Sequence, residues 1–196
     1  MRLRYLAQPA RLRDGRSAWI REVRADDEAA IRRFVSNLSP SSRYFRFMMG
    51  MRELSDDAVW HFTRPLAGKE AVLVSTPGSS LGTITGVAQF VIDADGESCE
   101  IALVVDDAWQ RQGLGSMLLS ELGTFAARHG VSRIHADVLN DNHAMRRLAE
   151  KAGCELRHDA ATPFVLRLSK RLPGITPAGI RSPAHAMQPA VAGIVR

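Results

Sequence analysis

The chain has 196 residues, of which 45% are hydrophobic and 24% charged, and its formal net charge is +5. This length suits one domain with appendages, and the hydrophobic content is enough for a buried core. The sequence contains no apolar window of membrane-spanning length and no signal-peptide pattern, so we expect neither a membrane protein nor a secreted one. Cys99 and Cys154 have no partners at metal-ligand spacing, which predicts reduced core thiols in a cytoplasmic protein.

The positive charge is concentrated at the two ends of the chain. Residues 1–16 carry five arginines and one aspartate, and residues 170–196 carry four basic residues and no acidic residue. The remaining middle segment has a net charge of −3. A nucleic-acid-binding face would place its basic stripe on folded elements, so nucleic acid is not an expected partner.

The first part of the chain combines one strand pattern with three helical patterns. Ser17–Val23 fits a strand, and residues 1–16 either add a short edge to it or stay loose. The helices are expected from a cap at Asp26 or Asp27 to Asn37, over Ser42–Met49, and from a cap at Ser55 to about Thr63.

The second part predicts antiparallel strands followed by a β-α-β unit. Strands are expected at Glu70–Ser75, Leu81–Ile92, Ser98–Val105, Arg133–Leu139, Cys154–His158 and Pro163–Leu168, and helices at Leu114–His129 and Asn142–Ala152. This order predicts a mixed sheet with helices on both faces. From Leu172 onward the chain is rich in Pro, Gly and Ala without periodicity, and we expect a disordered tail.

A basic loop with two glycines joins the strand ending at Val105 to the helix beginning at Leu114. The loop places backbone N–H groups at a helix N-terminus, where the helix dipole favours an anion. Gly113 and Gly115 remove side chains that would keep a phosphate away, and Arg111 adds a guanidinium suited to phosphate oxygens. The pattern is Gln/Arg-x-x-Gly-x-Gly/Ala; it lacks the lysine of nucleoside-triphosphate loops and the third glycine of dinucleotide loops.

Residues Glu100–Gly153 resemble the acetyl-CoA-binding core of the Gcn5-related N-acetyltransferase (GNAT) family, through this loop, Asn142 and the Lys-Ala-Gly at 151–153. Upstream, Leu38–Phe47 and Arg52–Asp56 resemble the acetyltransferase domain of bacterial protein lysine acetyltransferases of the Pat type. The resemblance covers residues 17–170. It leaves residues 1–16 as a basic extension and residues 171–196 as the tail.

The resemblance implies an α/β (α+β) GNAT fold: a mixed, mostly antiparallel sheet of six or seven strands with helices on both faces. It also implies a V-shaped splay between the strand Ile101–Val105 and its neighbour Arg133–Leu139. An N–H group freed by the splay would polarise the thioester carbonyl. The implied donor is acetyl-CoA, with no metal. The residues implied to bind it are Val104, Val105, Gln110, Arg111, Gln112, Gly113, Leu114, Gly115, Ser116 and Asn142.

A lysine ammonium has a pKa of about 10.4 and must lose a proton before it attacks, so we expect a carboxylate beside the thioester to act as the general base. Glu100 occupies a position close to that of the catalytic glutamate in lysine-acetylating relatives, and Glu97 is the second choice. His61, His143 and His158 are weaker alternatives, of which His143 lies nearest the expected thioester.

Several roles stay open at the sequence level. Many relatives place a tyrosine general acid seven residues after the asparagine, where this chain has Ala149. Asn142 either holds the pantetheine arm or simply caps its helix. Phe45 and Met48 either touch the acceptor or pack in the core, and Trp109 is expected to pack under the loop.

The leading function is acetyl transfer from acetyl-CoA to a primary amine, with a protein lysine as the first choice of acceptor. The alternatives are a small amine (a polyamine, an aminoglycoside or an amino acid) and a CoA-binding sensor without turnover. Acidic residues at the 93–100 hairpin either attract a basic segment or are ordinary surface charges. The oligomeric state is left open, a homodimer included.

Overall fold

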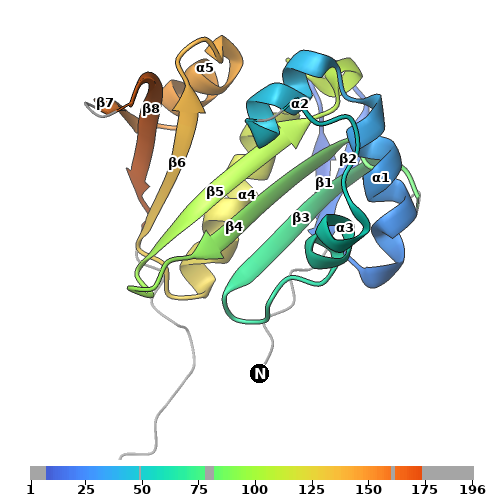
Figure 1. Ribbon diagram of the computed structural model, residues 1–196, viewed down its shortest axis with the longest axis horizontal. Coiled ribbons are helices and arrows are strands. Elements are labelled where there is room, and N and C mark those ends of the chain that lie inside the picture. Colours follow the sequence, from blue (N-terminus) through green and yellow to red (C-terminus); the bar gives the residue numbers. More distant parts are fainter. Residues whose placement is uncertain (1–7, 49, 78–81, 160–161, 174–196) are drawn as a thin grey trace, which may run out of the picture.

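A mixed sheet of eight strands, in the order β1-β2-β3-β4-β5-β6-β8-β7, runs through the computed structural model of the protein (Figure 1). The structure describes residues 8–48, 50–77, 82–159 and 162–173. The strands are β1 (Gln8–Arg11), β2 (Ser17–Glu22), β3 (Glu70–Pro77), β4 (Gly86–Ile92), β5 (Ser98–Val105), β6 (Arg133–Leu139), β7 (Glu155–Asp159) and β8 (Thr162–Arg171). All neighbouring strands are antiparallel except β5 and β6. The fold class is confirmed, and the short edge strand β1 takes the sheet beyond the expected six or seven strands.

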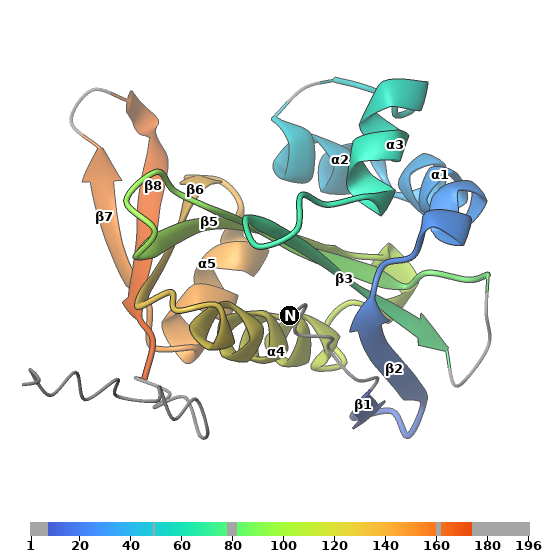
Figure 2. The same ribbon diagram turned by 90° about the horizontal axis from the view of Figure 1, so that it is seen from below.

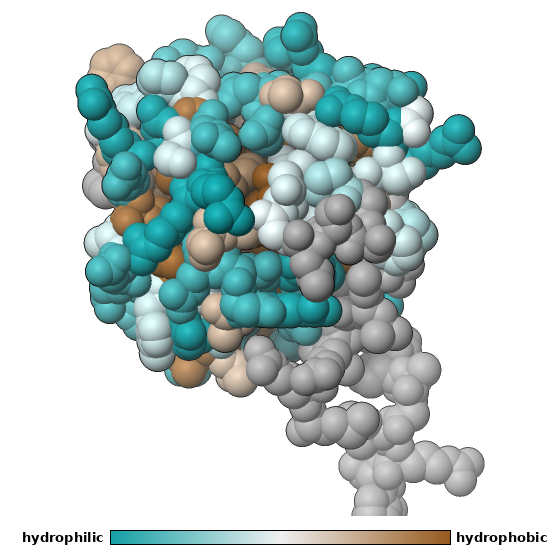
Figure 3. Space-filling view, turned by 90° about the vertical axis from the view of Figure 1, so that its right-hand side faces the viewer, coloured by the Kyte–Doolittle hydropathy of each residue, from teal (hydrophilic) through white to brown (hydrophobic). Residues whose placement is uncertain are grey.

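Helices cover both faces of the sheet (Figure 2). α1 (Glu28–Asn37), α2 (Pro40–Phe47) and α3 (Asp56–Thr63) lie on one face, and α4 (Leu114–Arg128) and α5 (His143–Lys151) lie on the other. On the side of the molecule where α1 lies, the surface is mostly hydrophilic, and hydrophobic residues show only between polar side chains (Figure 3). This fits a helix that buries Ile31 and Phe34 toward the sheet.

The alternation of side chains along β5 fixes which face each residue serves. Cys99, Ile101 and Val105 belong to the core cluster beneath α4, whereas Val104 belongs to the cluster beneath α1 and α3. Because successive side chains point to opposite faces, Glu100 lies on the same face as Val104. We call this the acceptor face.

The predicted splay between β5 and β6 is confirmed by their register. These strands pair only at Ser98↔Arg133, Cys99↔Ile134 and Glu100↔His135. Beyond that point β6 stays paired with β8 as far as Leu139, while β5 stays paired with β4 as far as Val105. The two arms therefore diverge toward the ends of β5 and β6 (Figure 1).

A buried ion pair attaches the start of α1 to the sheet. Arg21 of β2 donates from Nη1 and Nη2 to the two carboxylate oxygens of Asp27, at 2.6 and 2.7 Å. Asp27 stands at the N-cap of α1, as expected, but its carboxylate binds Arg21 instead of the helix amides. Burial raises the pKa of Asp27, and the hydrogen bonds from Arg21 and the Arg24 amide outweigh that effect, so the pKa lies below its usual value.

Four expected segments fall partly outside the described residues: the basic extension, at residues 1–7; the helix over Ser42–Met49, at Met49; the strand Leu81–Ile92, at Leu81; and the tail, from residue 174 onward. Within the described part, no helix is long and apolar enough to cross a membrane.

Candidate active site

The glycine loop forms an anion cradle at the start of α4. Arg111 and Gly113 both adopt left-handed backbone conformations, with φ of 60° and 97°, and α4 begins at Leu114. Among the described residues, none accepts a hydrogen bond from the backbone amides of residues 111–116. These amides, the helix dipole and the guanidinium of Arg111 fit a diphosphate such as that of CoA.

The loop is bound to the N-terminal end of α2 by a polar network. The side-chain amide of Gln110 donates to the Val105 carbonyl at 3.0 Å and to Ser42 Oγ at 3.2 Å. The carboxylate of Asp107 accepts from the Ser39 amide at 2.9 Å and from the hydroxyls of Ser39 and Ser42, each at 2.8 Å. Partial burial raises the pKa of Asp107, but the hydrogen bonds from Ser39 and Ser42 lower it further, so the net shift is downward.

The turn between β1 and β2 also contacts the loop. Arg16 donates to the Ala108 carbonyl at 3.0 Å, and its guanidinium carbon lies 4.0 Å from the centre of the Trp109 ring. The Arg13 amide donates to the Gln112 carbonyl at 3.1 Å. Trp109 itself packs against the core cluster beneath α4, as expected. Part of the segment predicted as a basic extension therefore contacts the anion cradle.

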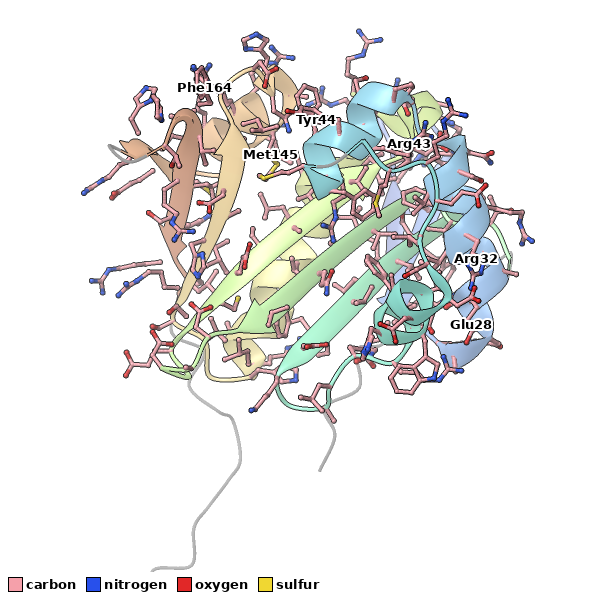
Figure 4. All side chains as sticks on the ribbon, in the orientation of Figure 1. Glu28, Arg32, Arg43, Tyr44, Met145 and Phe164 are labelled. Carbon is pink, nitrogen blue, oxygen red and sulfur yellow. The ribbon has the colours of Figure 1, made fainter. Side chains whose placement is uncertain are left out.

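A cleft of about 440 Å³ opens where the two arms diverge. Tyr44 of α2 and Phe164 of β8 line it (Figure 4). Asn140 and His143 also line the cleft. Asn142, at the start of α5, accepts from the Met145 amide at 3.0 Å, so its oxygen caps the helix. Ala149 is fully buried.

Glu100 lies on the acceptor face at the last paired position before the splay. Its neighbours in the sheet are Val91 on β4 and His135 on β6. The side chain is exposed. Glu100 is thus beside the open edge of β5, where a ligand strand would add.

Sequence reasoning missed two residues that lie near Glu100. Arg46 of α2 donates from Nη2 to Gln89 Oε1 at 2.9 Å on the acceptor face. His135 lies opposite Glu100 in register, and its Nε2 is 2.7 Å from Asp93 Oδ2. The parallel register of β5 and β6 would have pointed to His135, whereas Arg46 sits in a run that reads as an apolar cluster.

The other candidate residues have less suitable surroundings. His61 is exposed near Asp57, at 3.5 Å, and His158 is exposed on β7, so only His143 lies in the cleft. Phe45 is half-buried, and Met48 is 43% exposed at the end of α2. Burial raises the pKa of the Cys99 thiol to about 12 and also raises that of Cys154, which argues against a nucleophilic cysteine.

Comparison with known proteins places the chain in a family. The model described as "Acetyltransferase (GNAT) family" matches residues 42–154. Acetyltransferase PA5475 of Pseudomonas aeruginosa is 29% identical over 140 residues, which are 70% of this chain and 74% of that protein. Acetyltransferase Pat of Mycolicibacterium smegmatis is 31% identical over 132 residues, which are 67% of this chain and 35% of Pat. The chain therefore spans only about a third of the length of Pat.

Solved structures agree with the family match. The GNAT domain of S. lividans PAT superposes with a TM-score of 0.78 at 29% identity, covering 85% of this chain and 97% of that one. The yncA structure of Salmonella typhimurium, solved with its cofactor acetyl-CoA, has a TM-score of 0.63 at 25% identity and covers 80% of this chain and 94% of that one.

The family match covers more than half of the chain, so the protein belongs to the GNAT acetyltransferase family. It is an acetyl-CoA-dependent N-acetyltransferase, and the anion cradle and the splay are the features that suit this donor.

Proposed function

We propose that the protein transfers the acetyl group of acetyl-CoA to the side-chain amine of a protein lysine, with Glu100 as the general base. The observation that supports the base is the position of Glu100 on the acceptor face, at the last pair before the splay. Support for a lysine acceptor comes from the similarity to Pat of M. smegmatis and to the GNAT domain of S. lividans PAT.

In this reaction each part of the site has a chemical task. The amides of residues 111–116 bind the diphosphate, and the open edge of β5 near Val104 and Val105 pairs with the pantetheine amides. The nitrogen of the neutral amine bonds to the carbonyl carbon of the thioester, and Glu100 accepts a proton from that nitrogen. The C–S bond breaks, and CoA leaves as a thiolate that takes up a proton.

The test is CoA release measured with three groups of acceptors: whole proteins, lysine peptides and small amines. We expect release with lysine peptides, and we expect Glu100→Gln to lower kcat by about 10²–10⁴-fold because general-base catalysis is lost. The dissociation constant for acetyl-CoA should stay unchanged.

Glu97→Gln, on the same hairpin, is the matched control and should retain turnover. Full activity of Glu100→Gln would move the base to another group, with Glu97 and His143 as the next candidates. Release with small amines alone would replace the lysine acceptor. Binding of acetyl-CoA without release for any amine would indicate a sensor.

A further inference from the structure

Arg46 places a positive charge on the acceptor face beside Glu100. Its hydrogen bond to Gln89 positions the guanidinium over β4. Gln89 and Val91 are neighbours on one face of β4, and Val91 is the register partner of Glu100 on β5. The guanidinium therefore lies close to the carboxylate that we propose as the base.

The surroundings of Arg46 are apolar. The guanidinium carbon is 5.1 Å from the centre of the Phe47 ring and 5.8 Å from that of Phe62. Nε is buried and has no hydrogen-bond partner among the residues that the structure describes. Burial lowers the pKa of Arg46 to about 10, and the negative charge of Glu100 acts in the opposite direction. Arg46 is consequently charged at neutral pH.

The hydrogen bond of Arg46 goes to a neutral amide. A guanidinium that bound Glu100 bidentately would occupy the carboxylate oxygens that the base needs. Held by Gln89, Arg46 contributes its charge near Glu100 and leaves those oxygens for the acceptor. This arrangement suits an electrostatic role better than a structural salt bridge.

We propose that Arg46 balances the charge of Glu100, so that the acceptor amine occupies the site in its neutral, nucleophilic form. A carboxylate alone would attract the lysine ammonium and hold its proton. A guanidinium nearby repels the ammonium and leaves the neutral amine unaffected. Arg46 is a positioning and specificity residue for the same site, and this inference rests on the proposed function.

Other titratable groups near the site must be separated from this effect. On β6, His135 is held by Asp93, and its Nδ1 lies 3.4 Å from Arg167. On α3, His61 is exposed and near Asp57. On α2 itself, Arg43 donates to the carbonyls of Ser36 and Leu38. His135 is the register partner of Glu100 on β6, so it needs its own variant.

The experiment measures kcat and KM against pH, with the acceptor that gives most CoA release, for wild type, Arg46→Met, Arg46→Gln and Arg46→Lys. Because kcat reports groups in the enzyme–substrate complex, its rise with pH follows the bound amine. In the two neutral variants that rise should move up by about one to two pH units, the effect of a unit charge several ångströms away at an effective dielectric constant of about 20. At pH 7 their kcat and KM should fall together, because the ammonium is bound more tightly.

The controls distinguish charge from structure. Arg46→Lys should restore the wild-type pH profile of kcat. In the His135→Gln background, Arg46→Met should still shift that profile. Arg157→Met, on exposed β7, should leave the profile unchanged. An unshifted kcat profile in both neutral variants, or an equal shift in Arg46→Lys, would overturn the role of Arg46 while leaving the proposed function intact. If the wild type fails to release CoA with every amine tested, the proposed function fails and this inference fails with it.

Discussion

Gly113 meets two requirements of the anion cradle at once. Its φ of 97° is a conformation that residues with a side chain rarely adopt, and a Cβ there would find no atom within 4 Å. The space above Gly113 is therefore open to a ligand. A substitution there would strain the backbone, but its Cβ would not clash with another protein atom.

Gly113→Glu should weaken acetyl-CoA binding by at least about 10- to 100-fold, because a carboxylate would face the diphosphate at a few ångströms. Gly113→Ala carries the same backbone strain without the charge and should cost about 1 kcal/mol of stability with a smaller loss of affinity. Isothermal titration calorimetry with acetyl-CoA measures both. Equal affinity of wild type and Gly113→Glu would show that the loop does not bind the diphosphate.

Among single residues, those that are adjacent in sequence could be predicted to act together, whereas residues brought together by folding could not. The loop and the helix start of the anion cradle could be predicted because the glycines, Arg111 and Leu114 are adjacent in sequence, and anion binding there stays a prediction. Arg46 could not, because its proximity to Glu100 depends on how α2 packs on the sheet. His135 became significant only through the register of β5 and β6.

Among the elements, the junction of β2 and α1 contains the most deeply buried ion pair found between described residues. The side chains of Arg21 and Asp27 are only 8% and 6% exposed. Removal of one partner leaves a buried charge without compensation, which costs more than the pair itself contributes.

Arg21→Met should lower the free energy of unfolding at pH 7 by about 3–5 kcal/mol. Because the pKa of Asp27 is lowered in the folded state, the stabilisation is present above the unfolded pKa of about 3.9 and is lost as the pH falls through the folded pKa. The difference from wild type should therefore shrink toward acid pH. Urea denaturation at pH 7 and below pH 4 measures this difference.

Arg32→Met serves as the exposed counterpart. The side chains of Arg32 and Asp56 are 41% and 97% exposed, so this variant should cost less than about 1 kcal/mol. A cost for Arg21→Met as small as that for Arg32→Met would contradict the importance of the buried pair.

Element boundaries were predictable where one pattern dominated. β5 and β6 have the predicted bounds, because each is an apolar or alternating run between clear turns. α2 begins earlier than predicted, since Pro40 fits the first turn of a helix and Ser39 acts as its cap. β4 begins at Gly86, five residues later than Leu81, the expected start.

On the scale of the whole molecule, the protein consists of two sheet arms that share few backbone contacts. β1–β5 and β6–β8 are joined in the sheet through the three residue pairs between β5 and β6. The sequence predicted this splay through its family resemblance; it gave no means of deciding whether residues 1–16 would join the sheet. β1 does so by pairing with β2.

Acetyl-CoA should raise the unfolding temperature by binding across both arms. A ligand at 100 times its dissociation constant adds about 2.7 kcal/mol to the stability of the folded state. Differential scanning fluorimetry with increasing acetyl-CoA should show a progressive rise for wild type and a much smaller one for Gly113→Glu. A flat response in wild type would contradict binding at the splay.

The shortness of the β5–β6 ladder has a consequence for how the apo protein opens. Where β5 and β6 are not paired, their backbone amide protons exchange with solvent. A donor substrate bound along this stretch would supply the missing hydrogen-bond partners. If the cosubstrate pairs with β5 as proposed, it completes the sheet as well as supplying the acetyl group, and the two arms are then held together most firmly when the enzyme is ready to react.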